Sequence, residues 1–218
     1  MVIKHTFLKH KGGFYNYRIH NNKLDQHCKG NGFNPLFDYL NDVFEACPNE
    51  YFNKGPRSST LKFKLVDDLI EIQGHEVSSL ARYGLENNRY RFNDDHSKVQ
   101  VFMLENDNST VAMEVPIWLF PNEVGAYKSV FGSSDVLTGH IDVLRIEDGK
   151  ICIWDYKPNA QKEKYASTQT FFYALMLSRR TGLSLDKFRC GYFDSNFTFL
   201  FKPEESFLEG LNEQKILF

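Results

Sequence analysis

The feature that most constrains this chain is an Asp148-Gly149 pair set between two alternating apolar segments, residues 136–146 and 151–157. Asp-Gly in this setting is the strongest short-range signal of a β-hairpin, because a tight type I′ turn needs a positive φ at both central residues. The turn also fixes the register of the two strands. In that register Asp142 stands directly opposite Asp155.

Two carboxylates placed in this way lie on one face of the sheet, with Cβ atoms about 4.5–5.5 Å apart. At that distance they repel each other, and a divalent cation between them removes the repulsion. Oxygen ligands favour Mg²⁺ or Mn²⁺ over zinc. Lys157 follows Asp155 by two residues and leans onto the same face, where the register places it opposite His140. A slip of one residue would move the whole set to the other face.

This set of side chains is suited to phosphodiester hydrolysis. A metal held by Asp142 and Asp155 activates a water molecule and neutralises the phosphoryl oxygens. Lys157 can orient or deprotonate that water, or it can stabilise the developing charge. The residues alone leave these roles of the lysine open.

Four short motifs resemble the PD-(D/E)XK nuclease superfamily, in particular its RecB-like and phage-type exonuclease branch. In chain order they are Glu114-Val115-Pro116, Gly139-His140-Ile141-Asp142, Asp155-Tyr156-Lys157 and Gln169-x-x-x-Tyr173. The match covers roughly residues 111–177. The resemblance implies a restriction-endonuclease-like core, and it implies Asp142, Asp155 and Lys157 as the catalytic residues.

The resemblance also implies further site residues. The two aspartates would be metal ligands, with the backbone carbonyl of Tyr156 as a third. Gln169 and Tyr173, four residues apart on one helix face, would support the site and the DNA strand.

His75, Glu76 and Glu114 are further candidates for metal ligands. RecB-like nucleases place a His or Glu ligand on a helix before the sheet, and His75 or Glu76 fits that place best, although the spacing from Gly74 is poor. Glu114 either lines the site or faces solvent, since the alternation of its strand leaves Val111, Met113, Val115 and Ile117 on the other face.

The order of expected elements is that of an α/β (α+β) fold with a mixed central sheet flanked by helices. A basic hairpin turning at Asn21-Asn22 precedes a helix that starts at Pro35 and stops before Pro48. We expect helix over 61–85 with a break at Gly74. Strands follow at 99–104, 110–119, 136–146 and 151–157, then a helix at 162–180 and a hairpin at 188–201 with an acidic tail from Pro203. The chain divides into an N-terminal accessory region, 1–60, and a nuclease-like core, 61–218.

Composition limits which nucleic-acid surfaces, cofactors and cellular locations we expect for this protein. The 26 basic and 28 acidic residues give a net charge of −2, so any nucleic-acid surface must be a local patch. Residues 1–30 carry six Lys or Arg and one acid, with Phe14, Tyr15 and Tyr17 interleaved. This segment is either a phosphate-contacting arm or a solvated edge hairpin. The four scattered cysteines lack a Cys-x-x-Cys pair, so we expect no iron–sulfur cluster. No apolar run is long enough for a membrane span, and a cytoplasmic protein is expected.

The leading hypothesis is therefore a Mg²⁺- or Mn²⁺-dependent deoxyribonuclease, an exonuclease or an enzyme that processes single strands or ends in DNA repair or recombination. A helicase or recombination partner is compatible with that role. The alternatives are a nucleic-acid-binding module that does not cut, a restriction-type endonuclease, and an unrelated α+β enzyme. The sequence does not choose DNA over RNA.

Overall fold

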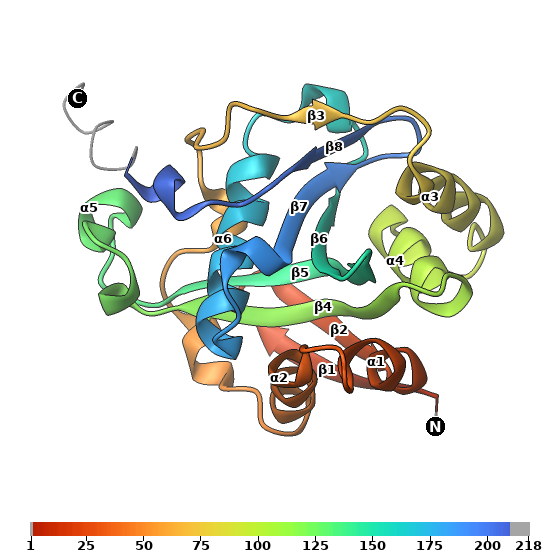
Figure 1. The fold of residues 1–218 in the computed structure, drawn as a ribbon, viewed down its shortest axis with the longest axis horizontal. Coiled ribbons are helices and arrows are strands. Elements are labelled where there is room, and N and C mark those ends of the chain that lie inside the picture. Colours follow the sequence, from red (N-terminus) through yellow and green to blue (C-terminus); the bar gives the residue numbers. More distant parts are fainter. Residues whose placement is uncertain (1, 210–218) are drawn as a thin grey trace.

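The computed structural model describes residues 2–209, which form one mixed sheet with helices on both faces (Figure 1). The sheet has eight strands in the order β1-β2-β4-β5-β6-β7-β8-β3. Its strands are β1 (Ile3–His10), β2 (Gly13–His20), β3 (Ile70–Glu71), β4 (Thr110–Leu119), β5 (Leu137–Glu147), β6 (Lys150–Tyr156), β7 (Phe188–Phe193) and β8 (Thr198–Phe201). The β6–β7 pair is parallel, and the other neighbouring pairs in this order are antiparallel. This mixed α/β architecture confirms the predicted fold class, a restriction-endonuclease-like core.

Six α-helices and several short 3-10 helices accompany the sheet within the described residues. The α-helices are α1 (Asn21–Cys28), α2 (Asn34–Glu45), α3 (Glu76–Asn87), α4 (Asp95–Asn106), α5 (Tyr127–Phe131) and α6 (Ala166–Thr181). Short 3-10 helices are η1 (Asn49–Asn53), η2 (Ser58–Thr60), η3 (Pro121–Glu123), η4 (Ala160–Lys162), η5 (Leu185–Lys187) and η6 (Glu205–Leu208). None of the helices in the described part of the chain is both long and apolar enough to span a membrane.

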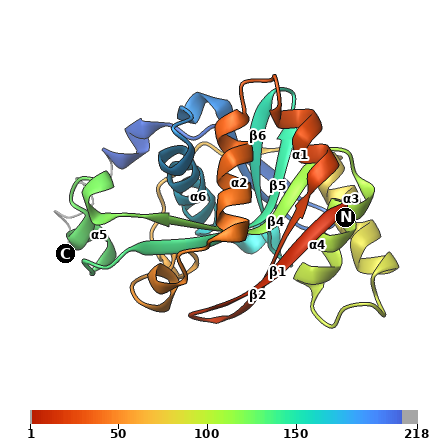
Figure 2. The ribbon, with the colours of Figure 1, turned by 90° about the horizontal axis from the view of Figure 1, so that it is seen from below.

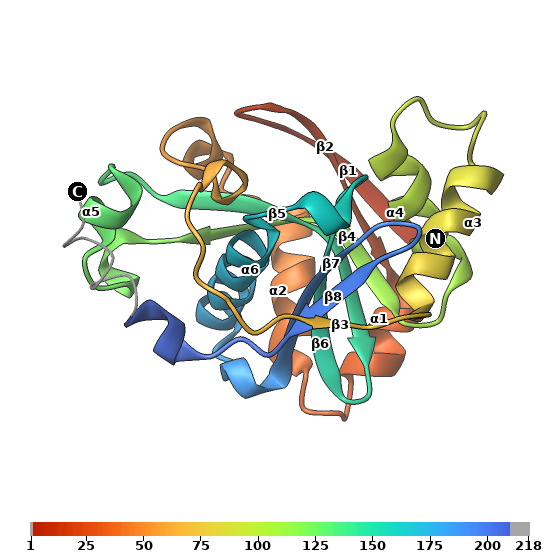
Figure 3. The same ribbon diagram turned by 90° about the horizontal axis from the view of Figure 1, so that it is seen from above.

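Strand β6 shows how the two faces are filled. Ile151 and Ile153 point into the main core, which α2 and α6 share. Cys152 and Trp154 point the other way, into a second core under α3 and α4. Figure 3 shows α2 and α6 grouped together and α3 and α4 set apart from them. The sheet is therefore covered on both faces, and its β6 residues read as a nearly continuous apolar run.

The N-terminal hairpin turns earlier than expected. Its strands are joined at Lys11-Gly12, and Asn21-Asn22 begins α1 instead, so the predicted turn was wrong. Gly12 and Gly13 have φ of 99° and 153°, which only glycine adopts freely, and this sets the turn. Strand β2 pairs with β4, so the first 60 residues share the sheet and the main core with the rest of the chain (Figure 2).

The segment expected as a helix over 61–85 is half wrong. Residues 61–69 have no regular structure, β3 follows, and α3 begins only after Gly74. Thr168 of α6 holds the irregular stretch in place. Its hydroxyl donates to the Phe63 carbonyl at 2.8 Å and accepts from the Leu65 backbone N–H at 3.0 Å. Tertiary hydrogen bonds thus replace the helical ones here.

The strand predicted at 99–104 is also wrong, because these residues lie in α4. Asp94 caps this helix by accepting the Ser97 backbone N–H at 2.7 Å. Helix α4 is wedged between α3 and the sheet. Val101 packs with Met113 in one cluster and Val99 with Trp154 in another. Burial on more than one side gives an apolar pattern that imitates the alternation of a strand.

The remaining elements match the prediction. The strand over 110–119, the Asp148-Gly149 hairpin, the 188–201 hairpin and a helix that starts within a turn of the expected place are all present. Gly182 ends α6 with φ of 71°. The predicted acidic tail from Pro203 contains the short helix η6. Its last part, residues 210–218, lies outside the described residues.

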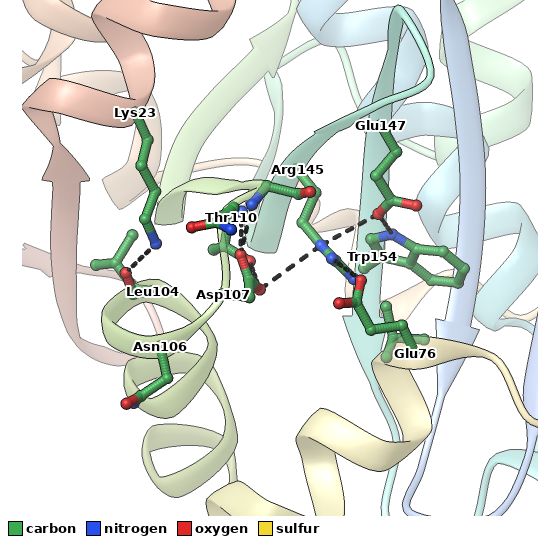
Figure 4. A network of polar contacts seen from close by, with 12 residues as sticks. Lys23, Glu76, Leu104, Asn106, Asp107, Thr110, Arg145, Glu147 and Trp154 are labelled. Atoms are coloured by element: carbon green, nitrogen blue, oxygen red, sulfur yellow. Dashed lines mark hydrogen bonds and ion pairs between the residues drawn. The ribbon is translucent and has the colours of Figure 1, made fainter.

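A buried arginine ties α3, the turn before β4 and the hairpin β5–β6 together (Figure 4). The Arg145 side chain is fully buried and donates to Glu76, and its Nε lies 3.1 Å from Glu147 and 3.7 Å from Asp107. Glu147 also accepts from the Trp154 indole at 3.0 Å. This network fixes the far end of the hairpin whose near end carries Asp142 and Asp155.

Candidate active site

Three neighbouring strands each bring one carboxylate to the same region. The β5–β6 ladder includes Val143↔Trp154, which confirms the register expected from the Asp-Gly turn and sets Asp142 opposite Asp155. The ladder ends there, and Asp142 Oδ2 accepts the Tyr156 backbone N–H at 3.0 Å. On the other side, Asp142 stands opposite Glu114, which lies between two paired positions of β4 and β5.

Glu114 interrupts the alternation of β4. Its φ is 54°, a left-handed conformation that non-glycine residues seldom adopt. Consequently Met113 packs against α4 while Val115 joins the main core, so the prediction that these two residues share a face was wrong. The Glu114 carboxylate accepts a hydrogen bond from Gln100 of α4 at 2.8 Å. The bend therefore turns Glu114 toward the site region and holds it there.

The carboxylates repel each other in a poorly solvated place. Burial, and then the charge of Asp155, raise the pKa of Asp142 to about 7, although His96 and Lys157 act against the rise. Burial and the charge of Asp142 raise the pKa of Glu114 to about 8, against the hydrogen bond from Gln100. Both carboxyl groups therefore hold a proton to higher pH than free carboxyl groups do, and a bound cation would oppose that.

Lys157 supplies the nearest positive charge. Its Nζ lies 2.6 Å from Asp155 Oδ2 and donates to Gln169 Oε1 at 3.2 Å. Burial alone would lower the pKa of Lys157, but the charges of Asp155 and Asp142 outweigh it and raise that pKa. The lysine is therefore an ammonium group at neutral pH in this arrangement.

Helix α6 positions both partners of the ion pair through Gln169. The Gln169 Nε2 donates to Asp155 Oδ1 at 3.0 Å and contacts the Tyr173 hydroxyl at 2.7 Å. Tyr173 fits because β5 has Gly139 beneath it. A Cβ at Gly139 would lie 2.4 Å from the Tyr173 ring and 2.6 Å from the Ser58 hydroxyl. The predicted pair Gln169 and Tyr173 thus meets Asp155 and Lys157.

The structure also brings His96 to the site, a residue that the sequence reasoning missed. His96 lies in the first turn of α4, and its Nε2 is 3.8 Å from Asp142 Oδ2. Its ring stands edge-on to Tyr156, with centroids 5.2 Å apart. The available signal was the Asn93-Asp94-Asp95 run, which is typical of a helix start. Because residues 99–104 were expected to form a strand, the helix that carries His96 was not predicted.

The two upstream candidates, His75 and Glu76, lie elsewhere. His75 caps α3 by accepting the Val77 backbone N–H at 3.3 Å, and its ring lies 5.1 Å from that of Trp154. Glu76 accepts from Arg145. Both residues therefore serve the α3 attachment in this structure.

His140 is not opposite Lys157, contrary to the expected register. The Lys157 backbone N–H donates to the Phe193 carbonyl of β7 at 2.9 Å. His140 instead lies 2.9 Å from His10, ring nitrogen to ring nitrogen, and stacks on Tyr15 with centroids 3.6 Å apart. The two strands have separated by this point, so the ladder no longer relates the two residues.

The donor set fits a hard divalent cation in its chemistry. The available groups are carboxylate oxygens, the ligand type that Mg²⁺ and Mn²⁺ prefer, and their raised pKa values reflect negative charge that a cation would offset. Within residues 2–209, no group of three or more His, Cys, Asp or Glu side chains is already gathered as a metal site. Asp155 is instead paired with the Lys157 ammonium.

A comparison with protein families identifies the family of the chain. The family model described as the PD-(D/E)XK nuclease superfamily matches residues 69–215, more than half of the chain. The chain belongs to the PD-(D/E)XK nuclease superfamily. Asp142 and Asp155-Tyr156-Lys157, the residues predicted to carry the superfamily's motif, lie within the matched range. No curated protein matched the chain.

Membership in the PD-(D/E)XK superfamily defines the general activity. Its members are nucleases that act on nucleic acid and generally use divalent metal ions. In the structure, acidic groups from β4, β5 and β6 lie beside one ammonium group.

Proposed function

We propose that this protein is a Mg²⁺- or Mn²⁺-dependent deoxyribonuclease that acts on single strands or DNA ends. One observation carries the proposal: Lys157 and Asp155 form a close pair beside Asp142, and Gln169 holds both members of the pair. An ion pair that served stability alone would not require a second, facing carboxylate whose pKa is raised to about 7.

In this proposal Asp142 and Asp155 hold the metal, with the Tyr156 carbonyl as a backbone ligand and Glu114 as an outer acidic group. The metal would supply a polarised water molecule and charge neutralisation at the phosphate. His96, at 3.8 Å from Asp142, takes the place of the upstream ligand in preference to His75. In the RecB-like branch, a His or Glu ligand on a helix before the sheet accompanies the superfamily motif, and His96 would be that ligand here.

The protonation of Lys157 narrows its role. The Lys157 Nζ lies 2.6 Å from Asp155 and donates to Gln169, so in this arrangement it acts as a hydrogen-bond donor. We assign it to the charge that develops on the phosphoryl oxygens in the transition state. Gln169 keeps Lys157 and Asp155 in register, and Tyr173 limits the movement of Gln169.

The preference for ends or single strands rests on the Gln169-x-x-x-Tyr173 pair. This pair resembles the RecB-like motif in sequence. In the structure Gln169 contacts Asp155 directly, and Tyr173 contacts Gln169. A restriction-type endonuclease would share the aspartates and the lysine, and no feature of the described residues favours it over the end-processing enzyme.

The test is cleavage of labelled single-stranded, linear duplex and closed circular DNA with Mg²⁺, Mn²⁺ or EDTA. We expect metal-dependent cutting of linear and single-stranded DNA. Lys157→Ala and Asp155→Ala should lower the rate by at least about 10²-fold, the scale for a lost transition-state donor. Lys202→Ala, an exposed lysine on the chain beyond β8, is the matched control. Cutting of circular DNA would replace the proposal with an endonuclease, and tight binding without cutting would favour a non-cutting module or a required partner protein.

A further inference from the structure

The outer face of the β1–β2 hairpin carries aromatic and basic side chains together. Directly paired residues share a face, so the pairs His5↔Arg18, Phe7↔Asn16 and Lys9↔Phe14 place six side chains on this side. Phe7 is 68% exposed and Phe14 is 77% exposed. The inner face, by contrast, contributes Leu8, Tyr17 and Ile19 to the main core. The exposed rings of Phe7 and Phe14 are therefore not part of the packed core of the fold.

The hairpin is uniformly basic. Residues 3–20 contain no Asp or Glu and include Lys4, Lys9, Lys11 and Arg18. On the outer face, Asn16 Oδ1 and Arg18 Nε are buried and have no hydrogen-bond partner within the described residues. The face thus combines positive charge, exposed aromatic rings and unused polar atoms, in a protein whose net charge is −2. That combination is complementary to a phosphate backbone with accessible bases.

The hairpin is fastened to the active-site strand. His10 lies 2.9 Å from His140, and Tyr15 stacks on the same ring. His140 precedes Asp142 by two residues on β5. At the base of the hairpin, Arg18 pairs with Met113, the residue before Glu114. The outer face therefore begins beside the site carboxylates and extends away from them, and Figure 3 shows the hairpin arching beyond β4.

The tip is held as well as the base. The Lys11 backbone N–H donates to the Phe52 carbonyl of η1 at 3.0 Å, and Arg57 donates to the Tyr15 hydroxyl. The Arg57 guanidinium also lies against Gly12, since a Cβ there would meet its Nη1. A hairpin fixed at both ends presents its rings in a defined place relative to the site.

We propose that this outer face binds single-stranded nucleic acid and leads it to the carboxylates, with Phe7 and Phe14 stacking on bases. The inference rests on the nuclease function proposed above and names the form of its substrate. In a duplex the faces of the bases are stacked on one another, whereas a single strand exposes them to aromatic side chains. Lys9 is paired with Phe14 and lies two residues from Phe7 on the same face, where it can contact the backbone phosphates.

The experiment measures binding of fluorescein-labelled oligo(dT) by anisotropy in EDTA, so that no cleavage occurs. Phe7→Ala and Phe14→Ala should each weaken binding about tenfold, the scale of one base–aromatic stack. Phe14→Trp keeps a stacking ring and should retain wild-type affinity. Ile70→Ala removes an equally exposed apolar side chain from the opposite edge of the sheet and should change nothing. Lys9→Ala should reduce the salt dependence of binding.

A second series separates this inference from the function on which it rests. With Mn²⁺, the ratio of single-strand to duplex cleavage should fall in Phe7→Ala and Phe14→Ala. If the wild type binds oligo(dT) through these rings but never cuts, the proposed catalysis fails and the hairpin assignment stands. If it cuts while both variants bind and cut as the wild type does, the hairpin assignment is overturned. Concentration-dependent dimerisation that Phe14→Ala abolishes, with oligo(dT) binding unchanged, would assign the face to a second copy instead and would also overturn it.

Discussion

Glu114 of β4 lies opposite Asp142 of β5 at the point where the Glu114 backbone adopts a φ of 54°. Such a conformation costs about 1–3 kcal/mol for a residue with a Cβ, and it persists only where the surroundings enforce it. Here the hydrogen bond from Gln100 and the flanking strand pairs do so. The conformation places a third acidic group beside two others, which is costly for a metal-free fold.

That cost predicts an unusual pH dependence. The folded-state pKa values of Asp142, about 7, and Glu114, about 8, exceed the ordinary values of 3.8 and 4.5. Between about pH 4 and 8 the folded state therefore binds more protons than the unfolded state, so stability is greatest at low pH and is lost as the pH rises through 7 to 8. Urea unfolding in EDTA at pH 5, 6, 7 and 8 should show a falling midpoint.

Glu114→Gln should flatten this dependence, because it removes one of the coupled charges. Glu45→Gln, an exposed acid on α2, should leave the slope as in the wild type. A midpoint that rises from pH 5 to pH 8 in the wild type would show that these carboxylates are ionised and stabilised without metal.

Two histidines on neighbouring helices offer a direct comparison for metal binding. His96 lies 3.8 Å from Asp142, whereas His75 contacts Val77 and Trp154. His96→Ala should weaken Mn²⁺ binding at least about tenfold, the lower range for loss of a metal-site partner. His75→Ala should leave Mn²⁺ affinity unchanged and lower the unfolding free energy by about 1 kcal/mol through the lost helix cap. Calorimetric titration with Mn²⁺ decides, and equal effects of the two changes would contradict the assignment of His96.

Gly139 is predicted to be essential for the placement of Tyr173. In Gly139→Ala the new Cβ would lie 2.4 Å from the Tyr173 ring, so ring or strand must move. We expect a loss of about 1–3 kcal/mol in stability, as for other overpacked cores, together with reduced cleavage because Gln169 loses its neighbour. Gly125→Ala is the control, since its Cβ would meet nothing within 4 Å. Thermal unfolding and cleavage rates of both variants test this, and a Gly139→Ala protein as active as Gly125→Ala would refute it.

The buried network around Arg145 should contribute strongly to the free energy of unfolding, although none of its residues belongs to the candidate site. Arg145→Met leaves the buried Asp107 and the partly buried Glu147 without their cation, which is expected to cost about 3–5 kcal/mol. Arg91→Met breaks the exposed pair with Glu105 and should cost less than about 1 kcal/mol. Chemical denaturation measures both. A cost for Arg145→Met no larger than that for Arg91→Met would mean that Asp107 and Glu147 are neutral or solvated in the folded protein.

The central hairpin could be predicted from sequence because its determinants are local. Asp148-Gly149 fixes the turn, and the turn fixes the pairing of Val143 with Trp154 and hence the place of Asp142. The same locality explains α6, whose end is set by Gly182. Both elements carry candidate site residues that the sequence singled out, Asp142, Asp155 and Lys157 on the hairpin and Gln169 on α6, and these residues lie together in the structure.

The missed parts depend on contacts between distant segments. Helix α4 is buried between α3 and the sheet, and the close approach of α3 requires Gly84, whose added Cβ would lie 2.9 Å from Val99. No pattern within residues 99–104 reports that neighbour, so the alternation suggested a strand and His96 went unseen. Likewise, the contact of His10 with His140 joins residues 130 positions apart, which no local signal predicts.

The hydrogen bond from the Lys157 backbone N–H to the Phe193 carbonyl affects when the site can form during protein synthesis. Strand β7 follows β6 only after the α6 crossover, so a chain still on the ribosome carries Asp142, Asp155 and Lys157 before it carries the strand that anchors the lysine. The residues that orient Asp155 also arrive late, on α6. The arrangement of Asp142, Asp155 and Lys157 described above is therefore complete only after α6 and β7 have been synthesised.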